Sequence, residues 1–218
     1  VYKKISQYGH VSDELEFIEL KVKEKAFICH FEKKTSQELP LVTVEMGDIV
    51  LNERNEWFEQ AVVEVNQAFS NQGLSIDQDQ IAVGDIGNQH IVLFVEDLNQ
   101  EVFEKIAGQL QASSCWDGMN VHLASEIAPD NKAKVIAERP GSSFRVLVWE
   151  RGCGLTAACG SGACVVGAAA LTSGFMDTDA WVELQMPGGS LFVRHTNPDA
   201  SVQLTGAAQF VFQGKISV

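Results

Sequence analysis

The sequence predicts an α/β fold in which a strongly curved sheet wraps around one buried helix. Residues 161–172 contain no charged side chain and consist mainly of Ala, Val and Gly. A helix without a polar face has to be buried on all sides. Short segments of alternating or β-branched apolar residues precede and follow it, as is typical of strands. Small side chains on the helix would let those strands approach it closely.

Apolar periodicity predicts the remaining elements, with no linker or repeat between them. Amphipathic helices are expected at 55–69, behind an asparagine cap, and at 99–110, because their apolar residues recur at helical spacing. Strands are expected in the following segments: 16–31, 41–46, 81–86, 90–95, 121–123, 134–137, 144–149, 181–186, 191–194, 202–204 and 210–212.

The charge balance excludes some classes of partner. The 218 residues include 16 Lys and Arg against 29 Asp and Glu, a net charge of −13, which argues against nucleic acid and against an anionic membrane surface. The longest apolar run, around 164–171, is far too short to span a bilayer. The five cysteines, an odd number, indicate reduced thiols. We therefore expect a cytoplasmic protein with neither a nucleic-acid nor a membrane partner.

A candidate active site lies where a predicted strand ends in Glu150-Arg151 and a Gly-rich turn leads to Cys159, at the start of the buried helix. The backbone N–H groups of residues 160–162 have no intrahelical partner, so they point outward and can seat an anion. The same helix end is expected to stabilise a thiolate and to lower the pKa of Cys159 toward neutrality. These features indicate a site for a small carboxylate whose proton is moved by cysteine.

Alternative interpretations of the three neighbouring cysteines are weaker. The spacing of Cys153, Cys159 and Cys164 does not match the short Cys-x2–4-Cys pairs of structural zinc sites, so no metal is expected. A disulfide between Cys159 and Cys164 is disfavoured because five residues along a helix place them on different faces. A buried, inert thiol explains Cys29 and Cys115 better than Cys159, because glycines flank Ser161 and a charged pair precedes the turn.

Polar residues beside other strands extend the candidate site. Asn88 and His90 lie between two apolar segments, where a polar hairpin tip explains them as well as a binding site does. Asn120 leads a strand and is similarly ambiguous. Asparagine side chains carry donors and acceptors, so two of them can hold the ammonium and carboxylate of an α-amino acid. Arg151 would clamp a carboxylate and Glu150 would pair with an ammonium, unless the two form only a solvated pair.

These residues fall in motifs that resemble those of the diaminopimelate epimerases. The resemblance rests on one long segment and several shorter ones in the family's order, from about Met46 onward. The long segment is Glu150-Arg151-Gly152-x-Gly154-x-Thr156-x-Ala158-Cys159-Gly160-Ser161-Gly162-Ala163-Cys164. The shorter ones are Gly87-Asn88-x-His90, Phe94-Val95-Glu96-Asp97, Asn120-Val121, Met186-Pro187-Gly188-Gly189 and Thr205-Gly206.

The resemblance implies an isomerase that needs no cofactor, pyridoxal phosphate included. It would interconvert LL- and meso-diaminopimelate in the synthesis of lysine and peptidoglycan precursors. The implied fold has two pseudo-symmetric lobes, each a curved mixed or antiparallel sheet around a central helix, with two cysteines facing opposite sides of the α-carbon. Cys159 matches the second-lobe cysteine. The other matches are Asn88, Asn120, Glu150 and Arg151 for the distal end of the substrate, Gly160 and Ser161 for the reacting carboxylate, and His90 near the reacting centre.

The family's first-lobe Cys-Gly-Asn-Gly segment has no counterpart in the sequence. We therefore expect part of a longer chain, with residues 53–206 as a complete second lobe and residues 1–52, plus a returning strand in 207–218, as a remnant of the first. A homodimer is compatible with this organisation. Leu155 and Gln89 depart from the family's usual residues and leave two alternatives: a related racemase or isomerase of another small amino or hydroxy acid, or a catalytically silent amino-acid-binding relative.

Overall fold

The computed structural model describes residues 17–22, 25–31, 41–51, 56–113, 119–127, 142–172, 180–195, 201–208, 212 and 214. The chain forms two compact units, one of residues 1–45 with 205–218 and one of residues 46–204. All candidate site residues lie in the larger unit. The strand predicted at 134–137 and most of the one at 210–212 lie outside the described residues, and so does the predicted cap at Asn55.

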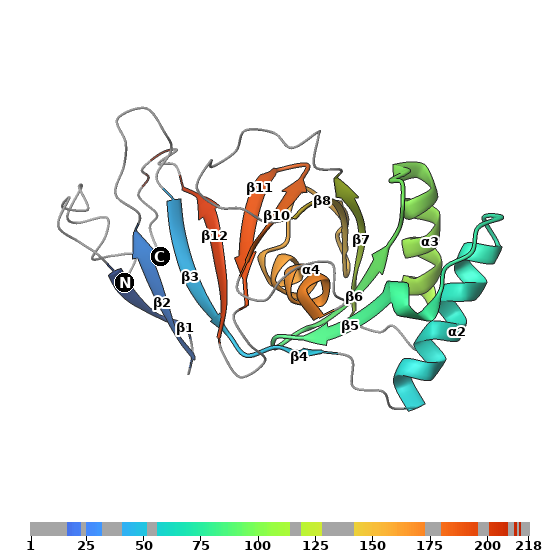
Figure 1. Cartoon of the computed structure of the whole chain (residues 1–218), viewed down its shortest axis with the longest axis horizontal. Coiled ribbons are helices and arrows are strands. Elements are labelled where there is room, and N and C mark those ends of the chain that lie inside the picture. The colour runs from blue at the N-terminus through green and yellow to red at the C-terminus, as the bar shows by residue number, and fades with distance from the viewer. Residues whose placement is uncertain are drawn as a thin grey trace. The chain divides into compact units, whose positions relative to one another are not determined.

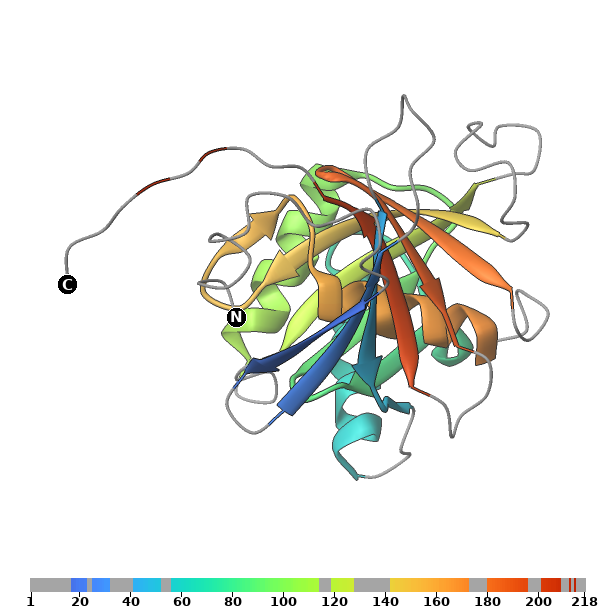
Figure 2. The ribbon, with the colours of Figure 1, turned by 90° about the vertical axis from the view of Figure 1, so that its left-hand side faces the viewer.

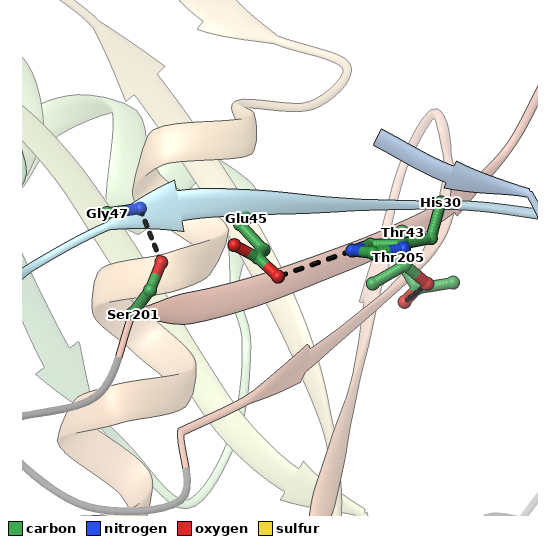
Figure 3. A network of polar contacts seen from close by, with 6 residues as sticks. All are labelled: His30, Thr43, Glu45, Gly47, Ser201 and Thr205. Atoms are coloured by element: carbon green, nitrogen blue, oxygen red, sulfur yellow. Dashed lines mark hydrogen bonds and ion pairs between the residues drawn. The ribbon is translucent and has the colours of Figure 1, made fainter. Parts of the chain in front are cut away.

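The strands of the smaller unit follow the order β1 (Phe17–Val22), β2 (Lys25–Phe31), β3 (Leu41–Gly47) and β12 (Val202–Ala207). The last residues of β3 and the first residues of β12 belong to the larger unit. Both β1–β2 and β2–β3 are antiparallel. Two polar contacts join neighbouring strands (Figure 3): His30 Nε2 lies 3.3 Å from Glu45 Oε1, and the hydroxyls of Thr43 and Thr205 lie 2.7 Å apart. That the unit is a remnant of a first lobe stays a prediction.

The larger unit is built on a mixed sheet with the strand order β12-β11-β10-β8-β7-β6-β5-β4, and β9 pairs with β8. The β6–β7 and β8–β10 pairs are parallel, whereas β4–β5, β5–β6, β7–β8, β8–β9 and β10–β11 are antiparallel. The predicted α/β class, with a mixed sheet around a helix, is confirmed. The strands are β4 (Val50–Leu51), β5 (Ile81–Asp85), β6 (Gln89–Phe94), β7 (Asn120–Ile127), β8 (Ser143–Glu150), β9 (Gly154–Thr156), β10 (Trp181–Met186) and β11 (Gly189–Arg194).

Helix α4 (Gly160–Thr172) is the predicted central helix, and every residue from Gly162 to Leu171 is buried. Figure 1 shows it inside the curve of the strands, and it contacts β4, β5, β6, β7, β10 and β11. Glycines make this approach close. A Cβ on Gly84 of β5 would lie 2.6 Å from Val165 Cγ1, and a Cβ on Gly167 of α4 would lie 2.6 Å from Val193 Cβ. Real Cβ atoms are not found that close to a neighbour, so the spacing requires these glycines.

The opposite face of the sheet carries α2 (Glu56–Ser70) and α3 (Gln100–Ala112), which lie side by side in Figure 1. Both were predicted within one or two residues of the observed bounds. Asn99 caps α3, its side-chain oxygen accepting a bond from the Val102 N–H at 3.1 Å. The central strands are buried on both sides, which explains their nearly continuous apolar runs. No helix within the described ranges has the length and apolar character required to cross a membrane.

Two glycine-to-alanine substitutions test whether the α4–sheet spacing is set by the absence of side chains. Gly167→Ala should lower the free energy of unfolding by about 1–3 kcal/mol, because the new methyl would overlap Val193. Gly108→Ala is the matched control, because Gly108 lies within α3 with nothing within 4 Å of its Cβ position. That change should raise stability by about 0.5–1 kcal/mol. Urea unfolding measures both, and equal effects would contradict the packing described.

Candidate active site

The fold brings the predicted site residues together from four places in the larger unit. Asn88 lies in the turn between β5 and β6, Asn120 begins β7, Glu150 ends β8, and Cys159 immediately precedes α4. The strand ends are adjacent because His90 on β6 pairs with Asn120 on β7, and the next residue, Val121, pairs with Trp149 on β8. Residues far apart in the sequence therefore meet at one edge of the sheet.

A short series of side-chain contacts joins the β5–β6 turn to the first turn of α4. Asn88 Nδ2 donates a hydrogen bond to Ser161 Oγ at 3.3 Å, and Ser161 Oγ lies 3.5 Å from Cys159 Sγ. Asn88 is exposed, whereas Cys159 is buried. The contacts therefore lead from solvent to the buried thiol across the helix end, where the backbone N–H groups of α4 lack helical partners.

Asn120 uses both ends of its amide to join neighbouring strands. Its Nδ2 donates to the carbonyl oxygen of Gln89 at 3.3 Å, and its Oδ1 accepts the Arg151 N–H at 3.2 Å. The side chain is buried, so these bonds satisfy an amide that has little contact with water. Arg151 itself is exposed. The amide therefore fixes the backbone from which the Arg151 guanidinium extends.

Glu150 is held by a short strand that the sequence did not predict. Gly152 and Gly154 both have a φ of 73°, and this left-handed backbone reverses the chain so that β9 pairs back onto β8, with Glu150 opposite Gly154. Thr156 Oγ1 then donates to Glu150 Oε1 at 2.6 Å. The Gly-rich turn thus orients a carboxylate that acts electrostatically on Cys159.

The prediction that the helix end lowers the pKa of Cys159 toward neutrality is wrong. Burial raises the pKa of Cys159 above its ordinary value of 9.0. Hydrogen bonds from the Ser161 hydroxyl and the Gly162 N–H lower the pKa, but the carboxylate of Glu150 raises it further. Desolvation outweighs the helix end, so Cys159 is a protonated thiol at neutral pH.

His90 is fully buried and pairs with a second buried histidine, His122, which sequence reasoning missed. His90 Nδ1 lies 2.9 Å from His122 Nε2. Burial lowers the pKa of His90 to about 4, although Asp85 raises it, and burial together with His90 lowers the pKa of His122 well below its ordinary value of 6.5. Both rings are therefore neutral at pH 7. The available signal was a histidine within the apolar segment predicted as the strand 121–123.

Among the described residues, the side-chain contacts of this site include no thiol other than Cys159. Cys29, Cys153, Cys159 and Cys164 are free, and burial raises the pKa of Cys164 to about 12. Cys153 is exposed in the turn after β8. In the part of the chain that the structure describes, no three His, Cys, Asp or Glu side chains are placed to hold a metal ion. Cys115 lies outside the described residues.

Sequence comparison identifies the family. The diaminopimelate epimerase profile matches residues 82–211, more than half of the chain, and the chain belongs to this family. Diaminopimelate epimerase of Phocaeicola vulgatus is 34% identical over 134 residues (61% of this chain, 43% of the relative), and that of Microcystis aeruginosa is 38% identical over 130 residues (59% and 41%). That of Azotobacter vinelandii is 31% identical over 176 residues (80% and 58%). The chain spans about half the length of the curated relatives it matches.

Solved structures support the fold alone, because their sequences are distant. A Bacillus anthracis phenazine biosynthesis protein of the PhzF family matches with a TM-score of 0.63 and 14% identity, over 99% of this chain and 73% of its own. A protein described as a predicted epimerase of Pseudomonas aeruginosa matches with a TM-score of 0.60 and 15% identity, over 99% of this chain and 72% of its own. The architecture around α4 is therefore shared beyond the family.

Alkylation of Cys159 tests the origin of its raised pKa. Glu150→Gln should lower the pKa and increase the rate of reaction with iodoacetamide at pH 8, because more thiolate is present. Ser161→Ala should raise the pKa and slow the reaction, because the thiolate loses a hydrogen bond. Each change should be about three- to tenfold. Peptide mass spectrometry gives the rate, and the exposed Cys153 serves as the internal reference. Slower reaction in Glu150→Gln would contradict the electrostatics.

Proposed function

We propose that this chain is the part of an amino-acid epimerase that moves the α-proton of diaminopimelate at one face of the α-carbon, with Cys159 as the acid–base group. The observation that carries the proposal is the position of the buried Cys159 thiol, next to the first turn of α4 and under the influence of Glu150. The chain's membership of the diaminopimelate epimerase family supports the substrate. The reaction would belong to lysine and peptidoglycan precursor synthesis in the cytoplasm.

The reaction needs stabilisation of negative charge at the substrate carboxylate, because an α-proton beside a carboxylate is very weakly acidic. In the proposed complex that carboxylate accepts hydrogen bonds from the backbone N–H groups of Gly160 and Ser161. The helix fixes the direction of these N–H groups before the reaction begins. Such preorganised donors act most strongly where water is excluded. The helix end would therefore perform the electrostatic work that a cofactor performs in other enzymes.

The protonation state of Cys159 suggests its direction of action. Because Cys159 rests as a thiol, it donates a proton to the carbanion, and the thiolate that forms accepts hydrogen bonds from Ser161 and Gly162. In the reverse direction that thiolate is a strong base, since its pKa is high. Inversion needs a second acid on the opposite face. The resemblance assigns it to a Cys-Gly-Asn-Gly segment, which these 218 residues do not contain.

The distal end of the substrate would be held by groups at the strand ends. The exposed Arg151 would bind the distal carboxylate in a bidentate manner, and Glu150 would pair with the distal ammonium. Asn88 offers an exposed amide beside Ser161. Asn120 would act chiefly by fixing the backbone of Arg151, since both ends of its amide are already bonded.

A second candidate is a catalytically silent member that binds an amino acid through the same groups. The raised pKa of Cys159 favours this alternative, because a silent site does not need a thiolate. The two candidates differ in whether the α-proton exchanges with solvent. They agree on which residues contact the ligand.

Deuterium exchange distinguishes the two candidates. The chain should incorporate deuterium at one α-carbon of LL- or meso-diaminopimelate in D2O without inversion, because the thiolate form of Cys159 removes the α-proton, the resulting thiol exchanges that proton for deuterium from the solvent, and the deuterium is returned to the same face. Cys159→Ser should lower this rate by about 100-fold or more. Cys153→Ser is the matched control and should leave it unchanged, because Cys153 is exposed outside the contacts described. Proton NMR follows the loss of the α-signal.

An equal exchange rate in Cys159→Ser would contradict the assigned role of the thiol. Saturable binding by the wild-type chain without any exchange would instead identify the silent alternative.

A further inference from the structure

The pairing of β8 with β9 decides to which side of the sheet the Glu150 side chain points. In this antiparallel pair Glu150 lies opposite Gly154. Two residues away along each strand, Val148 lies opposite Thr156. Successive side chains of a strand point to opposite faces, so Val148, Glu150 and Thr156 share one face. Val148 belongs to the apolar core around α4, as does Cys159. Glu150 and Thr156 therefore project on the side of the sheet where α4 lies.

The residue pair between these two faces the other way. Trp149 lies opposite Leu155, and both pack against the apolar cluster formed with α2 and α3. Leu155 therefore points away from the Glu150 carboxylate. Its departure from the family's usual residue lies outside the surroundings of that carboxylate.

Gly154 leaves the position directly across from Glu150 without a side chain, and the Glu150 carboxylate reaches diagonally to Thr156 instead. Diagonal neighbours in an antiparallel pair are about 7–8 Å apart, within reach of a long side chain. Thr156 Oγ1 donates to Glu150 Oε1 at 2.6 Å. This distance is typical of a hydroxyl bonded to an ionised carboxylate, so the bond is of the stronger, charge-assisted kind.

A carboxylate held in this place affects the thiol differently from one that is free to move. Glu150 is half-buried, so an unbonded side chain could turn its carboxylate into water, which would screen its charge. In the observed position the carboxylate acts on Cys159. Burial raises the pKa of Cys159 most, and Glu150 raises that pKa further, by its charge and as a hydrogen-bond acceptor for the thiol. The place of the carboxylate is therefore part of what keeps the thiol protonated.

We propose that Thr156 is a positioning residue of this site: its hydroxyl holds the Glu150 carboxylate on the α4 face of the sheet, where the carboxylate acts on Cys159 and can receive the ammonium of the bound amino acid. The part that concerns the amino acid rests on the proposed function, whereas the part that concerns the thiol does not. Threonine suits this role because a β-branched side chain has few rotamers, so its hydroxyl loses little freedom when the bond forms.

Alkylation of Cys159 by iodoacetamide at pH 8 tests the proposal without a ligand. Thr156→Val keeps the shape of the side chain and its preference for a strand, but removes the donor. The carboxylate should then turn toward water, and Cys159 should react about two- to fivefold faster. Thr156→Ser keeps the hydroxyl and should react as the wild type does. Thr172→Val is the matched control and should change nothing, because the Thr172 hydroxyl donates to helix carbonyls at the other end of α4.

A double variant shows whether Thr156 acts through Glu150. In Glu150→Gln the charge is already absent, so adding Thr156→Val should leave the reaction rate of Cys159 nearly unchanged. An unchanged or slower rate in Thr156→Val alone, or the same acceleration in the Glu150→Gln background, would overturn the proposal. Side-chain scalar couplings in the wild-type chain need no variant: Glu150 should occupy one χ1 rotamer, and averaging among rotamers would overturn the proposal as well.

Calorimetric titration with meso-diaminopimelate tests the part that rests on the proposed function. The affinity should fall about threefold or more in Thr156→Val and recover in Thr156→Ser, because a carboxylate fixed before binding loses less freedom when the ammonium arrives. Equal affinity in all three chains would overturn this part. Because alkylation needs neither ligand nor turnover, a chain with the expected alkylation rates but no α-proton exchange would refute the proposed function alone.

Discussion

The close approach of α4 to its surrounding sheet is the constraint on which the larger unit depends. Glycines permit it on both sides of the interface: Gly84 in β5 faces Val165, and Gly167 in α4 faces Val193. Gly162 continues the pattern at the helix start, against His122. Packing therefore fixes the helix end relative to the strand ends, and the N–H groups at that end are oriented before any ligand arrives. Preorganisation of this kind is what electrostatic catalysis requires.

The same burial that fixes the helix also sets the protonation states of the groups beside it. The pKa of Cys159 is raised and those of His90 and His122 are lowered, mainly because water is excluded. The groups that can move or share a proton are thus neutral, whereas the charged Glu150 and Arg151 lie at the end of β8. A site with neutral groups inside and charged groups at its rim suits an amino acid with two charged ends. In the proposed complex the distal charges would be bound at the rim, and the reacting α-carbon with its carboxylate would lie deeper, at the helix end.

The sequence predicted the elements whose signal is local and missed those that depend on the assembled fold. The composition of residues 161–172 was sufficient to predict a fully buried α4. The pKa of Cys159 was predicted in the wrong direction, because the helix end is visible in the sequence but the desolvation by surrounding strands is not. His122 was missed because its partner is determined by the β6–β7 register. The amide of Asn120 is visible as a donor and acceptor, but the two bonds that it makes depend on the register of β7 with β6 and with β8.

The central claim is that the end of β8 and the start of α4 form one amino-acid site, and calorimetric titration with meso-diaminopimelate tests it most directly. The account predicts saturable binding that weakens by about tenfold or more in Arg151→Gln, because a charge-assisted bond to the carboxylate is lost. Arg145→Gln should bind as the wild type does, since Arg145 is exposed elsewhere on β8. Absence of saturable binding, or equal affinity in the two variants, would contradict the account.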